Sequence, residues 1–306
     1  MDLSHIVVAT SLSSHTAAVY AQGVRLARAV GAKITLAHVD GTIRWRLPGL
    51  EMVRAYIEER QAITLGRLER DRDALRDAGV DAEMAIVSEH SVWRGLLELT
   101  SELGADLIVA GRGPDAPGLG TTAKRLARHA EVPLLLCSEG EPRNLDQLPA
   151  IEHVVAATDL SAISDLGARA AFDFARRVGA KLTLAHVVTP YASLLRDDSA
   201  VTQRAMAQLE AALRESAGAR LEVLAASLDD DVVPELLLAE KVAPALDGLA
   251  TDEGAILALA THGDSELDAI LLGSMAERVA AEARAPVLLL CRPYLAMFYQ
   301  DGLDEA

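Results

Sequence analysis

The sequence predicts an α/β fold in which two doubly wound domains follow one another, each built around a five-stranded parallel sheet. Three observations lead to this fold class. Short apolar runs rich in β-branched residues alternate with longer stretches of helical periodicity, the pattern of a parallel sheet covered on both faces. The pattern occurs twice within 306 residues, a length that suits two domains of ordinary size. In each copy a glycine-containing loop separates a late apolar run from a helical stretch, and open α/β sheets bind ligands at such loops.

The first half yields its elements in alternating order. Its apolar runs are short enough for strands, and the stretches between them carry apolar residues at helical spacing. Gly31 and Gly79 follow two of these stretches and are predicted to end the helices. We therefore expect strands at residues 6–10, 33–39, 82–88, 106–111 and 132–137, and helices at residues 14–30, 51–78, 92–103 and 121–130.

The second half repeats the first. Residues 30–39 read VGAKITLAHV and residues 178–187 read VGAKLTLAHV, an offset of 148 with one difference. The third strand of the second half is expected within residues 220–231, RLEVLAASLDDD, which end in an acidic turn. The repeat predicts a first domain at residues 1–138, a linker at 139–150, a second domain at 151–293 and a C-terminal tail at 294–306.

The offset between the two halves changes along the chain. LIVAGRG at residues 107–113 matches LALATHG at residues 257–263 with an offset of 150. Gly120-Thr121 then matches Gly273-Ser274 with an offset of 153. The glycine loop of the first half is therefore expected to be three residues shorter than that of the second.

Composition and charge narrow the classes of function. The net charge is −16, and residues 146–306 hold 12 Lys and Arg against 26 Asp and Glu, a net −14. Because binding to a nucleic-acid backbone needs a basic surface, we expect no nucleic-acid partner. No apolar run approaches the roughly 20 residues of a membrane span, and the start of the chain lacks the pattern of a secretory signal. Cys137 and Cys291 form no CxxC pair, so we expect a cytoplasmic protein without a membrane partner.

The glycine loop of the second half has the spacing of a phosphate-binding loop. It runs from Ala260 through Gly263 to Gly273 and Ser274. Glycines let a ligand approach the main chain, and a helix start offers unpaired N–H groups and the positive end of a dipole. In a sheet of order 3-2-1-4-5 the binding crevice lies between strands one and four. Asp159, at the end of strand one, should therefore face the loop, and an acceptor opposite a phosphate cradle suits a nucleotide.

Each half resembles a universal stress protein domain, and the whole chain resembles the tandem two-domain members of that family. The nucleotide-binding branch has a small residue, two positions, Gly, nine positions, and then Gly followed by Ser or Thr. An Asp at the end of strand one accompanies this motif. The second half matches it, with Ala260 in place of the usual first glycine. The resemblance implies an adenine-nucleotide-hydrolase-like fold.

The same resemblance implies roles for individual residues of the second half. Thr158 and Asp159 would contact the ribose and adenine, and Val187 would meet the adenine edge through its backbone. The residues that would line the phosphates are His262, Gly263, Gly273, Ser274 and Met275.

The middle of this loop departs from the family pattern. It carries Asp264, Glu266 and Asp268, where such proteins are usually basic or glycine-rich. Three carboxylates repel a triphosphate. Either a divalent cation lies between them and the phosphates, or the side chains point away, or the site takes less phosphate than ATP.

The first half departs further from the motif. Ser11 stands at the position of Asp159, and its short loop holds two prolines, which supply no N–H donors. We expect a weaker nucleotide site there. Its candidate residues are Thr10, Val39, Arg112, Gly113, Gly120 and Thr121.

Structural interpretations stand beside the functional ones. Asp159 precedes a helix and could serve as its N-cap, so capping and ligand contact are both open. The sequence holds no HExxH motif or cysteine cluster, so no metal site is expected. No serine lies in a nucleophile motif, so no catalytic residue is expected either.

The function that the sequence favours is a stress-response regulator. It would bind an adenine nucleotide, ATP first, with or without Mg²⁺, mainly in the second domain, and signal through contacts with a regulatory protein. The two domains would form an internal pseudo-dimer, and two chains could form a homodimer. The alternative is an interaction scaffold without ligand, in which the loops are relics. The chain offers no identifiable base or arginine finger, so any ATP hydrolysis would be slow and incidental.

Overall fold

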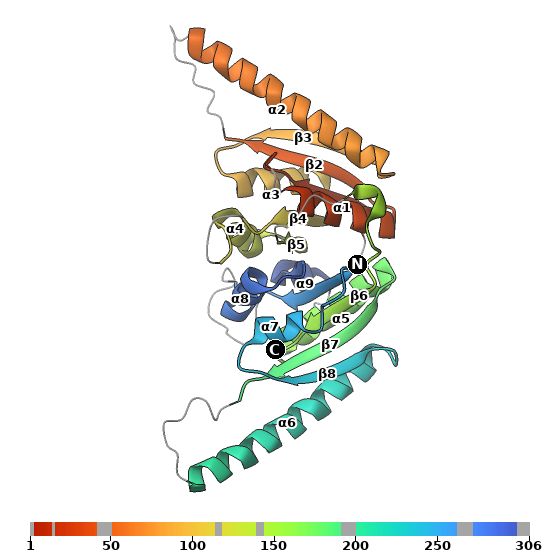
Figure 1. Cartoon of the computed structure of the whole chain (residues 1–306), viewed down its shortest axis with the longest axis vertical. Coiled ribbons are helices and arrows are strands. Elements are labelled where there is room, and N and C mark those ends of the chain that lie inside the picture. The colour runs from red at the N-terminus through yellow and green to blue at the C-terminus, as the bar shows by residue number, and fades with distance from the viewer. Residues whose placement is uncertain are drawn as a thin grey trace. The chain divides into compact units, whose positions relative to one another are not determined.

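The structure is a computed structural model of the whole chain (Figure 1). It describes residues 3–13, 16–41, 51–113, 118–138, 144–190, 200–261 and 272–298. The chain forms two compact units, residues 2–150 and residues 151–306. Each unit is an α/β domain in which parallel strands alternate with helices, so the predicted fold class is confirmed.

The N-terminal unit consists of β1 (His5–Ala9), α1 (Thr16–Val30), β2 (Lys33–Asp40), α2 (Glu51–Asp77), β3 (Ala82–Ser88), α3 (Val92–Leu103), β4 (Leu107–Gly111), α4 (Thr121–His129), β5 (Leu134–Cys137) and the 3₁₀ turn η1 (Leu145–Gln147). Its strands lie in the order β3-β2-β1-β4-β5 with parallel pairing, the predicted 3-2-1-4-5 arrangement. Right-handed crossovers place α1 and α2 on one face of the sheet and α3 and α4 on the other, where these two helices contact each other.

The C-terminal unit consists of β6 (His153–Ala157), α5 (Ala162–Val178), β7 (Lys181–Val188), α6 (Ala200–Leu228), β8 (Val233–Leu238), α7 (Val242–Asp247), β9 (Ala255–Ala260), α8 (Ser274–Glu282), β10 (Val287–Leu290) and α9 (Arg292–Phe298). Its strands lie in the order β8-β7-β6-β9-β10, again with parallel pairing. β6 and β9 are central, and their apolar side chains are almost all buried, which places the core around the same two strands that end at the predicted site.

The predicted position of the third strand of the C-terminal unit is wrong. Most of residues 220–231 belongs to the end of α6, and β8 follows the acidic turn. Leu221, Leu224 and Ala225 are buried, a spacing of three and four that matches one face of a helix. The apolar residues of this segment therefore form one face of a helix and do not alternate as in a strand.

The strand pairing corrects the alignment of the two halves by one residue. Val7 of β1 pairs with Ile108 of β4, whereas Val155, its equivalent in β6, pairs with Leu257 of β9. Ile108 therefore corresponds to Leu257, an offset of 149 in place of the expected 150. The glycine loop of the first half is accordingly four residues shorter, not three. Uniformly apolar central strands permit this slip, because both of their faces are buried and their hydrophobic pattern does not define the register.

The end of the expected linker is attached to α1. Arg28 donates from Nη1 to the carbonyl oxygen of Leu145 at 2.7 Å. Arg25 donates to the carbonyl oxygens of Pro149 and Ala150 at 2.8 and 3.0 Å. Arg25 is only 4% exposed, so these bonds lie within the N-terminal unit and tie residues 145–150 to it.

The segment expected as a C-terminal tail begins in a packed helix. α9 contacts α5, and its residues Tyr294 and Leu295 are buried. Residues 299–306 lie outside the described part of the chain.

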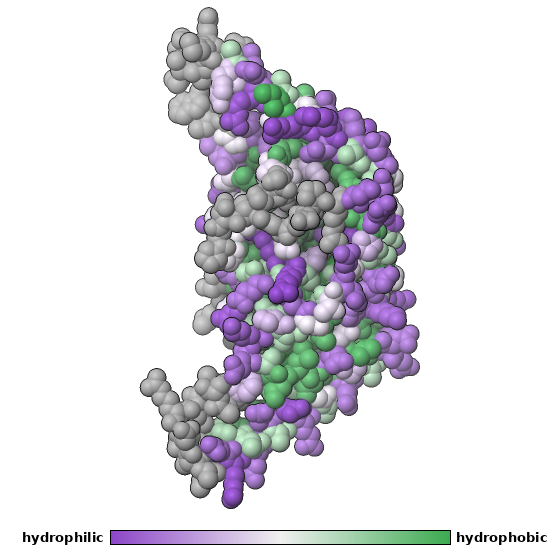
Figure 2. Space-filling view, viewed as in Figure 1, coloured by the Kyte–Doolittle hydropathy of each residue, from purple (hydrophilic) through white to green (hydrophobic). Residues whose placement is uncertain are grey.

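Hydrophobic side chains gather on the surface of the C-terminal unit over β7 and β8 (Figure 2). β8 is the outermost strand beyond β7, and its residues Val233 and Leu238 are 49% and 43% exposed. None of the described helices combines the length and the apolar character needed to cross a membrane.

Candidate functional site

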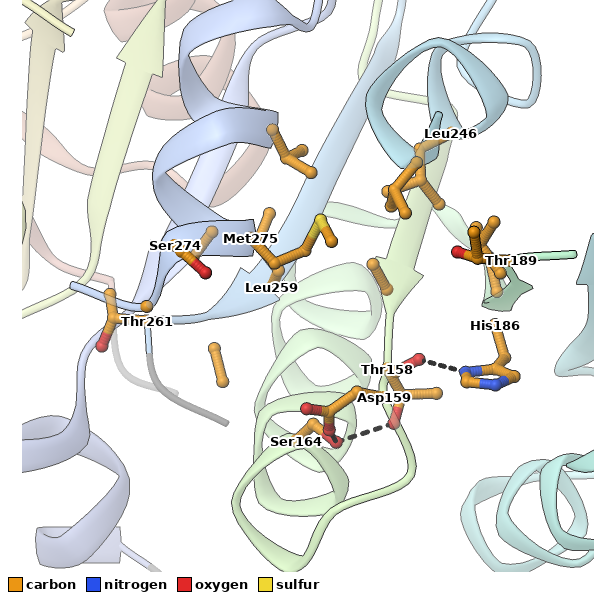
Figure 3. Close-up of a pocket in the computed structure, with 18 residues that line it drawn as sticks. Thr158, Asp159, Ser164, His186, Thr189, Leu246, Leu259, Thr261, Ser274 and Met275 are labelled. Atoms are coloured by element: carbon orange, nitrogen blue, oxygen red, sulfur yellow. Dashed lines mark hydrogen bonds between the residues drawn. The ribbon is translucent and has the colours of Figure 1, made fainter. Parts of the chain in front are cut away.

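A cavity of about 340 Å³ lies at the carboxyl ends of the central strands of the C-terminal unit (Figure 3). Its walls come from the ends of β6, β7 and β9, the starts of α5 and α8, and α7. β7 lies on one side of β6 and β9 on the other, so the chain order reverses here. This is the switch point at which open α/β sheets bind ligands.

Asp159 lies at the edge of this cavity, directly after β6. Its Oδ1 accepts hydrogen bonds from the backbone N–H of Ser161 at 3.0 Å and from the hydroxyl of Ser164 at 2.5 Å. The Ser164 hydroxyl is also 2.9 Å from Oγ1 of Thr158 (Figure 3). This network fixes the orientation of the carboxylate beside the end of β6.

The helix after Asp159 is capped by another residue. Ser161 is the N-cap of α5, and it forms a capping box with Ser164, whose hydroxyl and backbone N–H pair with the Ser161 main chain and side chain. Of the two roles left open for Asp159, that of the N-cap is therefore wrong. Asp159 instead closes a turn over Ser161, and it also lines the cavity.

The Asp159 carboxyl group is an anion at neutral pH. Burial opposes its ionisation, but hydrogen bonds from Ser161 and Ser164 outweigh burial and lower the pKa of the carboxyl group. An ionised carboxylate only accepts hydrogen bonds, so this side of the cavity suits a ligand that donates hydroxyl groups.

A second side of the cavity is apolar. Val187 at the end of β7 lines it together with Val242 and Leu246, which lie four residues apart on one face of α7. His186 supports this side, because its Nδ1 is 2.8 Å from the carbonyl oxygen of Thr158 and so ties the end of β7 to the end of β6 (Figure 3). The apolar wall suits a flat, weakly polar ring.

The third side of the cavity is the start of α8. Gly273 is the N-cap and has no side chain to cap this end, and Ser274 and Met275 line the cavity, with Met275 reaching from the first turn toward it (Figure 3). Gly273 donates its N–H to the carbonyl oxygen of Thr261 at 2.7 Å, which fixes the helix start against the end of β9. The first N–H groups of a helix have no intrahelical partner, and the helix dipole is positive here, so this end attracts an anion.

Ala260 replaces a glycine because the opposite helix provides the space. A Cβ atom added to Gly167 of α5 would lie 2.9 Å from the Cβ of Ala260. In the N-terminal unit the roles are reversed: Val19 of α1 faces Gly111 of β4, where an added Cβ would lie 3.6 Å from Val19 Cγ2. Each unit thus places a glycine on one side of this helix–strand contact. The departure of Ala260 from the motif is compensated within the fold.

The structure brings most of the predicted nucleotide-site residues together. The residues that line the cavity are Thr158, Asp159, Val187, Ala260, Gly273, Ser274 and Met275. Two others, His262 and Gly263, lie outside the described residues, and so do the loop carboxylates Asp264, Glu266 and Asp268.

Three residues of the site escape the sequence analysis. Ser164 positions Asp159, and its signal is the spacing of three residues from Ser161 that defines a capping box. Val242 and Leu246 form the apolar wall, and their signal is a spacing of four within a short helix. That spacing also fits an ordinary core helix, so it does not by itself indicate a site.

The N-terminal unit has a cavity of about 510 Å³ at the equivalent place. Of the six residues predicted for the weaker site, Thr10, Val39, Arg112 and Gly113 line this cavity, whereas Gly120 and Thr121 do not. Ser11 takes the position of Asp159, and its hydroxyl is 2.8 Å from that of Ser13.

Arg112 occupies the position of Thr261. Arg112 donates its backbone N–H to the carbonyl oxygen of Cys137, and Thr261 donates to that of Leu290, both at 3.0 Å. The match follows from the corrected offset of 149, so an arginine lines the N-terminal cavity where a threonine lines the C-terminal cavity. Among the described residues, no group of three His, Cys, Asp or Glu side chains is arranged to hold a metal ion.

The comparisons with known proteins agree with the predicted resemblance. The model of the universal stress protein family matches residues 3–138 and 150–290. Universal stress proteins of Mycobacterium tuberculosis and Mycobacterium bovis are each 27% identical over 289 residues, which cover 87% of this chain and 92% of theirs. A solved universal stress protein from Archaeoglobus fulgidus has a TM-score of 0.59 at 17% identity, covering 94% of this chain and 98% of its own. A Pseudomonas aeruginosa protein of unknown function has a TM-score of 0.58 at 16% identity, covering 99% and 98%.

Proposed function

The chain belongs to the universal stress protein family, a family of stress-response proteins, and we propose that its C-terminal unit binds an adenine nucleotide. ATP is the nucleotide that we favour. The observation that carries the proposal is the pairing, across one cavity, of the ionised Asp159 carboxylate with the start of α8, whose N-cap is a glycine. The carboxylate accepts hydrogen bonds from a sugar, and the helix start donates them to an anion.

Each part of an adenine nucleotide has a counterpart in this cavity. The ribose hydroxyls donate to Asp159, with the Thr158 main chain alongside. The adenine ring lies against Val187 and the apolar face of α7. The phosphates lie at the first turn of α8, where Ser274 and Met275 present main-chain N–H groups.

The nucleotide acts as a signal. It joins the end of β6 to the start of α8. We propose that occupancy changes the surface that the C-terminal unit presents to a regulatory protein. The chain would then report the supply of nucleotide without needing to consume it.

The first test asks whether the protein carries or binds the nucleotide. Freshly purified protein is examined by native mass spectrometry, and its thermal unfolding is followed with and without 1 mM MgATP. At a concentration 100 times the dissociation constant, a ligand stabilises the folded state by about 2.7 kcal/mol. Both tryptophans, Trp45 and Trp93, belong to the first half of the chain. The stabilisation should therefore appear in circular dichroism, which follows both units, and not in tryptophan fluorescence.

The matched control is Gly273→Asp. Gly273 has φ −57° and ψ 140°, a conformation open to any residue, and aspartate is a favoured N-cap, so the variant should fold. Its carboxylate occupies the place proposed for the phosphates and should abolish the stabilisation. If wild-type protein carries no nucleotide and MgATP leaves its melting unchanged, the proposal fails and the chain is better described as a ligand-free scaffold. A shift that survives in Gly273→Asp would place the site elsewhere.

A further inference from the structure

We propose that the cavity of the N-terminal unit binds a small organic acid, an apolar body with a single carboxylate held by Arg112, and not a nucleotide. This site goes beyond the proposed function, because it lies in the other unit and takes a different class of ligand.

The walls of this cavity are suited to an apolar body. Val19, Val39, Val92 and Leu96 line it together with five alanine and glycine residues, and its volume of about 510 Å³ lies within the range of small-molecule sites. Cys137 also lines it. Burial raises the pKa of the Cys137 thiol to about 12, so the thiol stays neutral and adds weakly polar surface.

Arg112 supplies the charge in this cavity. This residue lines the cavity and is only 7% exposed. The guanidinium lies close enough to Cys137 to oppose the effect of burial on the thiol pKa, which places the positive charge near the strand ends. A guanidinium carries five N–H donors in a planar fork, so it can hold a carboxylate through two of them while others bond to the protein.

Three other polar side chains of the cavity already take part in hydrogen bonds within the protein. Thr10 Oγ1 is 2.6 Å from the hydroxyl of Tyr20, and the hydroxyls of Ser11 and Ser13 are 2.8 Å apart. Among the described residues that line this cavity, none is an aspartate or glutamate. A carboxylate ligand therefore meets one cation and no competing anion from these lining residues.

The groups expected to hold a nucleotide are missing from the described lining. Ser11 replaces Asp159, so the acceptor proposed for the ribose is absent there. Gly120 and Thr121, the counterparts of Gly273 and Ser274, do not line the cavity. The loop between Arg112 and Gly120 is also four residues shorter than its counterpart. At the start of α4, Thr122, the counterpart of Met275, lines this cavity, whereas the N-cap Gly120 and the first helical residue Thr121 do not.

The test compares two ligands with the same apolar body. 2-Naphthoate carries a carboxylate, and 2-naphthamide is its neutral counterpart. Their binding is measured by titration calorimetry at pH 7.5 with the full chain carrying Gly273→Asp, which blocks the C-terminal phosphate position. We expect 2-naphthoate to bind at least tenfold more tightly than 2-naphthamide. We also expect 2-naphthoate, but not ATP, to raise the melting temperature seen by tryptophan fluorescence.

Single-residue variants test whether Arg112 binds the carboxylate of 2-naphthoate. Arg112→Met keeps the aliphatic length and should weaken 2-naphthoate binding at least tenfold while leaving 2-naphthamide unchanged. Arg125→Met removes an exposed cation of α4 that does not line the cavity, and it should have no effect. If Arg112→Met does not fold, Ser11→Asp tests the same point, because a carboxylate in the cavity should repel the ligand. The proposal is overturned if the two ligands bind equally, if Arg125→Met matches Arg112→Met, or if ATP displaces 2-naphthoate.

Discussion

The two cavities of this chain occupy equivalent places in two copies of one fold, yet they differ in charge. Their frames agree closely. The Nδ1 atoms of His38 and His186 lie 3.0 and 2.8 Å from the carbonyl oxygens of Thr10 and Thr158. The residue two positions after each threonine is a leucine with positive φ, near 60° in both units, whose N–H bonds to the threonine hydroxyl. Both copies have thus kept these hydrogen bonds and this leucine conformation in the turn after the first strand.

Among the described residues that line the cavities, the difference in charge rests on two positions. The C-terminal cavity has the anion Asp159 and the neutral Thr261, whereas the N-terminal cavity has the neutral Ser11 and the cation Arg112. These exchanges reverse the sign of the charge at the strand ends without disturbing the frame. A shared fold and a shared turn therefore do not imply a shared ligand, because one side chain at each strand end sets the electrostatics.

The largest expected effect is a loss of MgATP affinity when the charge of Asp159 is removed. Asp159→Asn keeps Oδ1 as the acceptor for Ser161 and Ser164 but removes the negative charge, so the variant should fold. Hydrogen bonds to charged groups contribute about 1.5–3 kcal/mol. We therefore expect the affinity for MgATP, measured by titration calorimetry, to fall ten- to hundredfold.

The matched variant of the other cavity is Ser11→Ala. It removes the hydroxyl that stands in the place of Asp159 and should leave the MgATP titration unchanged. Equal losses from both variants would mean that the two cavities share the nucleotide, and no loss from Asp159→Asn would remove the proposed role of the carboxylate.

The second prediction concerns the helix–strand contact behind each cavity. Gly167→Ala places a Cβ 2.9 Å from that of Ala260, and overpacking of this kind costs about 1–3 kcal/mol. The companion change Ala260→Gly should recover much of this cost in the double variant. In the N-terminal unit, Gly111→Ala meets only an ordinary contact at 3.6 Å, so it should be neutral or stabilising by up to about 1 kcal/mol.

Urea unfolding followed by circular dichroism and by tryptophan fluorescence distinguishes the stabilities of the two units. Gly167→Ala should shift the transition seen by circular dichroism and leave the tryptophan transition in place, while Gly111→Ala should change neither greatly. If Ala260→Gly does not restore stability to Gly167→Ala, the two residues do not compensate for each other. Gly167 is then not the reason that the fold tolerates alanine at position 260.

Much of this fold could be predicted from the sequence because local and global signals agree. Gly31 and Gly79 follow helices as expected, and the strand order follows from alternating elements with right-handed crossovers. The errors lie where one hydrophobic pattern fits two structures. Residues 220–231 carry enough apolar residues for a strand but belong mostly to α6, and the runs before Arg112 and Thr261 can slide by one residue without changing their character.

The residues of the site that belong to a motif could be predicted from the sequence. The residues that orient them could not. Asp159 and Gly273 are placed by topology alone, because strand one and the loop after strand four meet at the switch point. Ser164 is not, because its role depends on a hydroxyl that reaches back over five residues to Asp159. The correspondence of Arg112 with Thr261 was also hidden, since the alignment that was off by one residue paired Arg112 with His262.

The smallest expected effect tests a feature that the two units share. His5 and His153 lie at equivalent strand starts, and their Nε2 atoms are 2.7 and 2.8 Å from the hydroxyls of Thr35 and Thr183. Burial lowers the pKa of both rings below the ordinary value of 6.5. Below pH 6.5 the unfolded chain therefore binds more protons than the folded chain, and the free energy of unfolding falls as the pH is lowered.

His153→Gln removes one of these titrating rings, and His5→Gln removes the other. Urea unfolding at pH 7.5 and pH 5.0 should show a smaller loss of stability at the lower pH in each variant than in the wild type. The change for His5→Gln should appear in tryptophan fluorescence, and that for His153→Gln only in circular dichroism. A pH dependence that is unchanged in both variants would mean that the rings titrate alike in the folded and unfolded chain. Unequal changes would mean instead that the charges around them, Lys33 and Asp106 near His5 and Asp252 and Lys181 near His153, distinguish the two units even where the frame is the same.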